Sequence, residues 1–239
     1  METQTCNYLD IYNGLNFSKI IDHPNILIAA NFWEEERFQA AKACYKFMRE
    51  IDDMIDNYKS EFTLIADSEK DLFVSRVNQW ISSIRKGSYD NSFQRELIES
   101  FETFRIPFWT MEIFAKSMIY DIHNNGFSSL ESFLEYSGGA SIAPASVFVH
   151  LCGVSKKNGR YSSPVYDVRS TATPCAIFSY LVHIIRDFQK DQINNLNYFA
   201  DDMILRHGLS RQDLHDMAFG EKIMDGFRSM IKEYYELAD

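Results

Sequence analysis

Glycine and proline are scarce in this chain, with 10 and 5 copies among 239 residues. Because an all-β domain needs many tight turns, which these residues usually form, the composition disfavours a β fold. The four cysteines (Cys6, Cys44, Cys152 and Cys175) show no Cys-x-x-Cys spacing. Cys44, Cys152 and Cys175 lie in apolar stretches, so we interpret them as small core residues of a protein in a reducing compartment.

Long hydrophobic runs and excess positive charge are also missing. The longest apolar stretches, 141–154 and 175–185, are too short to span a bilayer and contain His150 and His183. Residues 1–4 lack the basic and apolar regions of a signal peptide, and the net charge of −10 disfavours a nucleic-acid partner. We therefore expect a cytoplasmic protein. A peripheral membrane contact, and a phosphorylated ligand bridged to the acidic chain by a divalent cation, stay open.

Helical periodicity dominates the sequence. Apolar residues between 34 and 58 recur at the three-and-four spacing of one helical face, and no strand-like alternation persists. The high aromatic content of 15% also suits a large apolar cavity. We predict one all-α domain over residues 1–239, with helices at about 34–58, 68–85, 92–103, 107–124, 129–136, 143–152, 174–189 and 210–237.

Three local signals mark the helix starts. Asn31 with Glu34, and Ser210 with Asp213, have the spacing of capping pairs. Pro174 suits the first position of a helix, where no N–H is needed. We expect polar loops at 158–164 and 207–209.

Two pairs of aspartates have a spacing that can carry chemistry. Asp52 and Asp56 lie four residues apart, on one face of a predicted helix, and Asp187 and Asp191 repeat this arrangement. A single acidic pair is usually a solvated surface feature, and its like charges repel. Here both pairs adjoin very apolar segments. If the two helices face each other, four carboxylates can bracket Mg²⁺ ions, which favour oxygen ligands and phosphate groups.

An arginine precedes each aspartate pair, Arg49 before Asp52 and Arg186 before Asp187. A guanidinium group at this position can form an ion pair within the helix or bind a phosphate directly. The residues alone do not decide between these roles.

These segments resemble the squalene/phytoene synthase family, the head-to-head branch of the trans-isoprenyl diphosphate synthases. Residues 45–56 are similar to the family's first aspartate motif, and residues 185–191, followed by Tyr198, are similar to its second. Asp121 lies fifteen residues before Tyr136, and residues 136–140 resemble the small-residue helix break of the family. The resemblance extends from about residue 25 to 237.

The resemblance implies a helical bundle in which two prenyl diphosphates, farnesyl or geranylgeranyl, ionise with Mg²⁺ in a central apolar cavity and couple head to head. Aromatic faces in such a cavity can stabilise carbocations. NADPH stays open, since no Gly-x-Gly-x-x-Gly fingerprint is present. Carried over by position, the metal ligands and catalytic residues are Asp52, Asp56, Asp187 and Asp191, with Tyr198 also catalytic; the substrate-binding residues are Tyr45, Arg49, Asp53, Asp121, Tyr136, Ser137, Tyr180, His183 and Arg186.

Three departures from the family pattern keep other functions open. The stretch His23-Pro24-Asn25 stands where the family usually has a serine-containing flap segment. Tyr180 and His183 stand where the family commonly has glutamine and asparagine, and the chain ends one or two helices earlier than typical members. A homodimer could supply the missing wall. The alternatives are a non-catalytic relative that binds lipid or assists assembly, and a terpene cyclase-like enzyme that ionises a single diphosphate.

Overall fold

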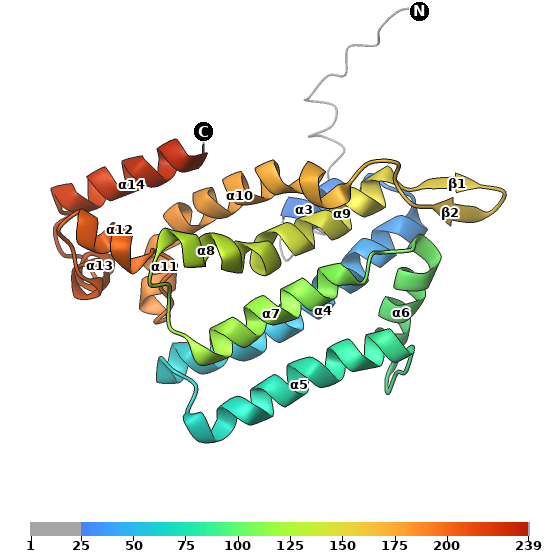
Figure 1. The fold of residues 1–239 in the computed structure, drawn as a ribbon, viewed down its shortest axis with the longest axis horizontal. Coiled ribbons are helices and arrows are strands. Elements are labelled where there is room, and N and C mark those ends of the chain that lie inside the picture. Colours follow the sequence, from blue (N-terminus) through green and yellow to red (C-terminus); the bar gives the residue numbers. More distant parts are fainter. Residues whose placement is uncertain (1–24, 239) are drawn as a thin grey trace, which may run out of the picture.

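The structure, a computed structural model, describes residues 25–238 (Figure 1). The predictions about residues 1–4 and Cys6 lie outside this range. The helices are α3 (Asn25–Ala30), α4 (Glu35–Phe62), α5 (Asp67–Lys86), α6 (Ser92–Phe104), α7 (Trp109–His123), α8 (Leu130–Ser137), the π-helix η1 (Gly138–Ile142), α9 (Ala143–Gly153), α10 (Val168–Arg186), α11 (Phe188–Ile193), α12 (Asp201–Arg206), α13 (Arg211–Ala218) and α14 (Asp225–Ala238).

Helix α7 lies at the centre of the fold (Figure 1). It packs against α4, α5, α9 and η1, while α10 packs against α9, η1 and α14. The core is built from apolar side chains at helical spacing, such as Ile51 and Ile55 of α4 and Met111 and Met118 of α7, all at most 1% exposed. The predicted all-α fold is confirmed.

The start of α10 differs from the prediction. The helix begins at Val168, where the Asp167 side chain accepts a hydrogen bond from the Ser170 N–H at 2.6 Å, and it contains Pro174 in its interior. A proline there removes the hydrogen bond to the carbonyl four residues earlier. Both Pro174 and Ser170 are exposed, so water can satisfy that carbonyl. The predicted start at Pro174 was wrong because the capping aspartate is the stronger signal.

The predicted helix at 210–237 is two helices, α13 and α14. Its start is confirmed, since Ser210 and Asp213 form a reciprocal capping box. The helix ends at Ala218 because Gly220 adopts a left-handed backbone with φ of 106°, which glycine accepts without strain. The other predicted cap is wrong, because α4 begins after Glu34 and the structure gives it no capping hydrogen bond from a side chain.

A short antiparallel hairpin replaces part of the predicted loop at 158–164. Strands β1 (Ser155–Lys157) and β2 (Arg160–Ser162) pair around Asn158 and Gly159, whose φ angles are 51° and 76°. Two successive positive φ angles at Asn-Gly are the signature of a two-residue hairpin turn. The hairpin projects from the end of the helical body (Figure 1).

Residues 136–140 do form a break between helices, as the resemblance implied, and the break is the π-helix η1. Within it, a Cβ added at Gly139 would overlap the carbonyl oxygen of Ile113 and the hydroxyl of Ser117 in α7. Nothing lies within 4 Å of the equivalent position at Gly138. Gly139 is therefore required for the close packing of η1 on α7, and the neighbouring Ala140 and Ser141 face the cavity described below.

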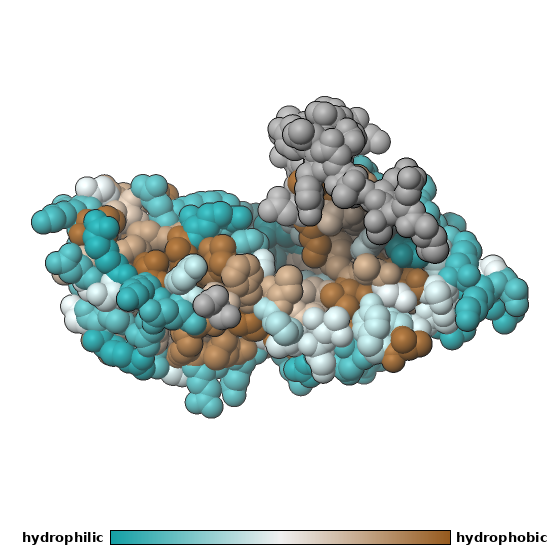
Figure 2. Space-filling view, turned by 90° about the horizontal axis from the view of Figure 1, so that it is seen from above, coloured by the Kyte–Doolittle hydropathy of each residue, from teal (hydrophilic) through white to brown (hydrophobic). Residues whose placement is uncertain are grey.

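Two cysteines and several large apolar residues are exposed. Cys44 is buried as expected, but Cys152 and Cys175 are exposed, which corrects their assignment to the core. Figure 2 shows apolar surface gathered over α10 and α14, where Phe178, Val182, Tyr235 and Leu237 are exposed. None of the helices between residues 25 and 238 combines the length and apolar character that crossing a bilayer requires.

Candidate active site

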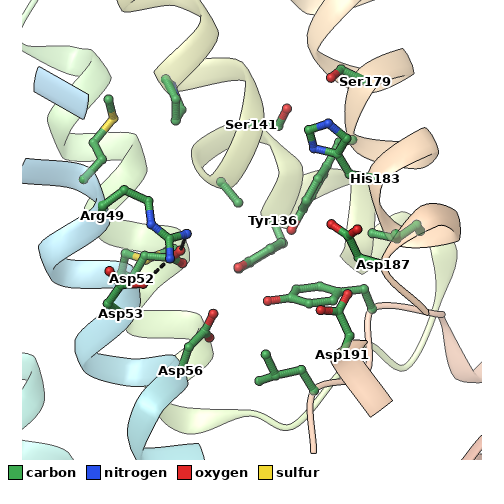
Figure 3. A pocket seen from close by; sticks show the side chains of 18 of the residues that line it. Arg49, Asp52, Asp53, Asp56, Tyr136, Ser141, Ser179, His183, Asp187 and Asp191 are labelled. Atoms are coloured by element: carbon green, nitrogen blue, oxygen red, sulfur yellow. Dashed lines mark hydrogen bonds and ion pairs between the residues drawn. The ribbon is translucent and has the colours of Figure 1, made fainter. Parts of the chain in front are cut away.

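A cavity of about 910 Å³ lies between α4 on one side and α10 and α11 on the other. Helix α4 carries Asp52 and Asp56 into this cavity on one face, since the residues are one helical turn apart (Figure 3). Arg49 donates to Asp52 at 2.6 Å (Nη1 to Oδ2) and also forms an ion pair with Asp53. The first wall of the cavity is thus an acidic helical face with one arginine.

The opposite wall carries the second aspartate pair (Figure 3). Asp187 is the joint residue at which α10 ends and α11 begins, and Asp191 lies in the short α11. The backbone N–H of Asp191 donates to the Asp187 carbonyl at 2.9 Å, so helical spacing persists across the joint. Arg186 binds Asp187 through two hydrogen bonds of 2.7 and 2.6 Å. The prediction of one continuous helix at 174–189 is wrong, although both aspartates still face the cavity.

Three carboxyl groups that face the cavity have pKa values above the usual range. Burial, reinforced by the charges of Asp121 and Asp53, raises the pKa of Asp52 to about 6 against the opposing effect of Arg49. Burial and the neighbouring Asp52 raise the pKa of Asp56 to about 8. Across the cavity, burial and Asp187 raise the pKa of Asp191 to about 6. The protein alone does not supply enough positive charge to keep all these groups ionised.

Aromatic rings cover the cavity wall between the two acidic faces. The Tyr180 ring lies 6.5 Å from Tyr136 and 6.3 Å from Tyr198, measured between ring centroids. Burial is the main cause that raises the pKa of all three phenols well above the usual value, so their hydroxyls stay protonated. Apolar side chains, among them Phe114 and Met118, also line the cavity. The wall can therefore accommodate a hydrocarbon chain beside a charged group.

The structure brings nearly all of the predicted site residues to one cavity, including Tyr45 and His183. Two lie elsewhere. Ser137 is buried and donates to the Phe133 carbonyl at 2.7 Å, and Asp121 is buried behind Tyr136, whose hydroxyl donates to it. Sequence reasoning missed Lys59, which contacts Asp121. Its position seven residues after Asp52, on the same helical face, was the available signal.

The model of one protein family, described as "Squalene/phytoene synthase", matches residues 23–239. The chain belongs to the squalene/phytoene synthase family. A solved dehydrosqualene synthase in complex with ligand shares the fold, with a TM-score of 0.68, 14% identity, and coverage of 97% of this chain and 75% of that one. The squalene synthase HpnC from Alicyclobacillus acidocaldarius has the same TM-score and identity, with coverage of 96% and 78%. No curated protein matches the chain.

The cavity fits the divalent metal that squalene/phytoene synthases use. Its aspartates outnumber its cations, and Arg49 and Arg186 are each already paired with an aspartate. Within residues 25–238, no three histidine, cysteine or acidic side chains converge closely enough to hold an ion by themselves. This arrangement suits Mg²⁺, which takes one or two carboxylates and completes its coordination with water and substrate phosphate oxygens.

The raised pKa values predict that Mg²⁺ stabilises the protein most at alkaline pH. A carboxyl whose folded-state pKa is raised stabilises the fold when protonated, and this contribution is lost as pH rises from about 4 through the folded-state values of about 6 to 8. Metal binding favours the ionised form and should reverse the loss. We expect Mg²⁺ with inorganic pyrophosphate to raise the melting temperature by about 5 °C at pH 8 and by much less at pH 5.

The control for this measurement is the Asp52→Asn/Asp56→Asn variant. Without metal it should melt at a higher temperature than the natural protein at pH 8, because two buried charges are removed, and it should lose most of the response to Mg²⁺. Equal Mg²⁺ shifts at both pH values, or an unchanged response in the variant, would show that the ions bind elsewhere.

Proposed function

We propose that this protein is a Mg²⁺-dependent prenyltransferase that condenses two prenyl diphosphates head to head and releases diphosphate. The observation that supports this most directly is the pairing of two aspartate faces across one cavity that also has aromatic and apolar side chains in its wall. A prenyl diphosphate has the matching composition, a charged head on a long hydrocarbon chain. Membership of the squalene/phytoene synthase family supports the same reaction class.

The acidic faces and arginines act on the diphosphate. Asp52, Asp56, Asp187 and Asp191 would hold Mg²⁺, which supplies the positive charge that stabilises a departing diphosphate. Arg49 and Arg186 lie beside these carboxylates and present N–H donors suited to phosphate oxygens. Together these groups lower the free energy of the charge that develops on the leaving group.

The tyrosines act on the hydrocarbon part of the reaction. The faces of Tyr136, Tyr180 and Tyr198 present negative ring quadrupoles to an allylic cation, which they attract without forming a bond. Because the rings and the apolar lining exclude water, the second prenyl chain rather than water would capture the cation. Carbon–carbon bond formation is then favoured over hydrolysis.

The test is incubation of the purified protein with Mg²⁺ and farnesyl or geranylgeranyl diphosphate, followed by measurement of diphosphate and analysis of products with and without NADPH. We expect diphosphate release together with a hydrocarbon, or a cyclopropyl prenyl diphosphate, that contains two prenyl units. A product with one prenyl unit would favour the cyclase-like alternative. Absence of release with both substrates would contradict the proposal and favour a non-catalytic lipid-binding or assembly role.

The cytoplasmic location stays a prediction from the sequence. The sequence leaves four other points open: the length of the prenyl substrate, the use of NADPH, a homodimer and a peripheral membrane contact. Product analysis addresses the first two, and sedimentation of the purified protein with and without lipid vesicles addresses the last two.

A further inference from the structure

A lysine is buried directly behind the aromatic wall of the cavity. Lys59 lies in α4, one turn beyond Asp56, and only 3% of its surface is exposed. Lysine is almost never buried unless its charge is paired, because transfer of an ammonium group out of water is costly. Lys59 does not line the cavity, so the proposed mechanism assigns it no contact with substrate.

The Lys59 ammonium group has two partners near the carboxyl end of α7. It donates to the Asn124 carbonyl at 2.8 Å and forms an ion pair with Asp121 Oδ1 at 3.4 Å. Asn124 is the C-cap residue directly after α7, at the helix end where the dipole favours a cation. The lysine thus joins the end of α7 to α4, the helix that carries the first aspartate pair.

Asp121 connects Lys59 to Tyr136, which lines the cavity. Its second carboxylate oxygen, Oδ2, accepts a hydrogen bond from the Tyr136 hydroxyl, while the Tyr136 ring faces the cavity. The backbone beneath the ring is also fixed, since Ser117 of α7 donates to the Tyr136 carbonyl at 2.7 Å. Asp121 is only 8% exposed, so Lys59 is the cation that balances its buried charge.

We propose that Lys59 is a positioning residue that keeps Asp121 ionised. The ionised Asp121 then accepts the hydrogen bond from the Tyr136 hydroxyl and fixes the phenol in the cavity wall. The consequence for catalysis rests on the proposed function. A carboxylate accepts a stronger hydrogen bond than a neutral acid does, and this bond holds the ring that faces a developing cation in place. Lys59 makes the Lys59–Asp121 pair neutral overall.

The first test measures the protonation of Asp121 by infrared spectroscopy and requires no turnover. In Lys59→Met, a chain of similar length replaces the ammonium group, and Asp121 would be left as an unpaired buried charge that takes up a proton. The difference spectrum of Lys59→Met against Lys59→Met/Asp121→Asn should contain the carbonyl stretch of a protonated carboxyl. The natural protein against Asp121→Asn should instead show carboxylate bands. Carboxylate bands in both difference spectra would overturn the proposal.

The second test separates positioning from metal or substrate binding. We expect Lys59→Met to lower kcat about 10- to 100-fold, while the Kd of a prenyl thiodiphosphate measured with Mg²⁺ stays within about twofold. In a Tyr136→Phe background the same substitution should have no further effect on kcat, because its action passes through the phenol. Equal losses in both backgrounds, or a parallel loss of affinity, would contradict the assignment.

Two further variants keep the test decisive. Lys70→Met removes another lysine that is paired with an aspartate, Asp67 on the surface of α5, and should leave kcat unchanged.

If Lys59→Met does not fold, Lys59→Met/Asp121→Asn, which lacks both buried charges, is compared with Asp121→Asn. Equal kcat values support Lys59 acting through Asp121, and a lower value in the double variant overturns it. If the natural protein shows no turnover, the proposed function fails, but the infrared test still shows whether Lys59 keeps Asp121 ionised.

Discussion

Replacement of Asp52 with asparagine should lower the rate of diphosphate release from a prenyl diphosphate about 10²- to 10³-fold. The amide preserves the size of the side chain but removes the charge and one oxygen ligand for Mg²⁺. It also removes one of the two ion-pair partners of Arg49, at 2.6 Å, and leaves Asp53 as the other. The loss should fall mainly on kcat, because negative charge builds up on the diphosphate in the transition state. Phosphate assay after addition of a pyrophosphatase measures it.

The matched control is Asp71→Asn, which removes an exposed aspartate of α5 that does not line the cavity. It should retain the rate of the natural protein to within about twofold, as expected for a surface substitution. Equal rates for Asp52→Asn and the natural protein would contradict the assignment of α4 to the diphosphate site.

Gly139→Ala should destabilise the protein by about 3 kcal/mol or more. The added Cβ would overlap the Ile113 carbonyl oxygen and the Ser117 hydroxyl, and the backbone of α7 cannot move aside without disturbing its packing on α4, α5 and α9. Forced expansion of a packed core typically costs about 1–3 kcal/mol, and more where backbone must shift. Urea denaturation of both proteins measures the difference in the free energy of unfolding.

The neighbouring Gly138→Ala is the matched control. Its added Cβ meets no atom within 4 Å, and its φ is −54°, so alanine should be neutral or stabilising by up to about 1 kcal/mol through its higher helix propensity. Similar losses in the two variants would contradict the assignment of Gly139 to the close approach of η1 to α7.

The first half of the site could be predicted from the sequence because its geometry is local. Asp52 and Asp56 share one helix, and a spacing of four residues fixes their common face whatever surrounds them. The helix bounds were also near the observed ones where the apolar period was clear, as in α5 and α6. Ser210 and Asp213 were found for the same reason, since a capping box is a short-range contact.

The rest depends on contacts between segments that are distant in the chain. No periodicity indicates that α10 ends at Arg186, or that Lys59 meets Asp121 across 62 positions. The hairpin turn did have a local signal, Asn158-Gly159, but the three-residue strands beside it are too short to show alternation. The resemblance of residues 136–140 to the family's small-residue helix break implied a break, whereas the contact that requires Gly139 is visible only in the packed structure.

The two aspartate pairs lie on helices of very different length. Asp52 and Asp56 belong to a helix of 28 residues. Asp187 is the joint residue between α10 and α11, and Asp191 lies in the six-residue α11. Helix α11 packs on α14 through Phe188 and Phe227, whose ring centroids are 4.5 Å apart. The second half of the proposed diphosphate site is therefore positioned by side chains that do not line the cavity. A substitution in α14 can therefore change how the two carboxylate pairs are spaced without altering any aspartate.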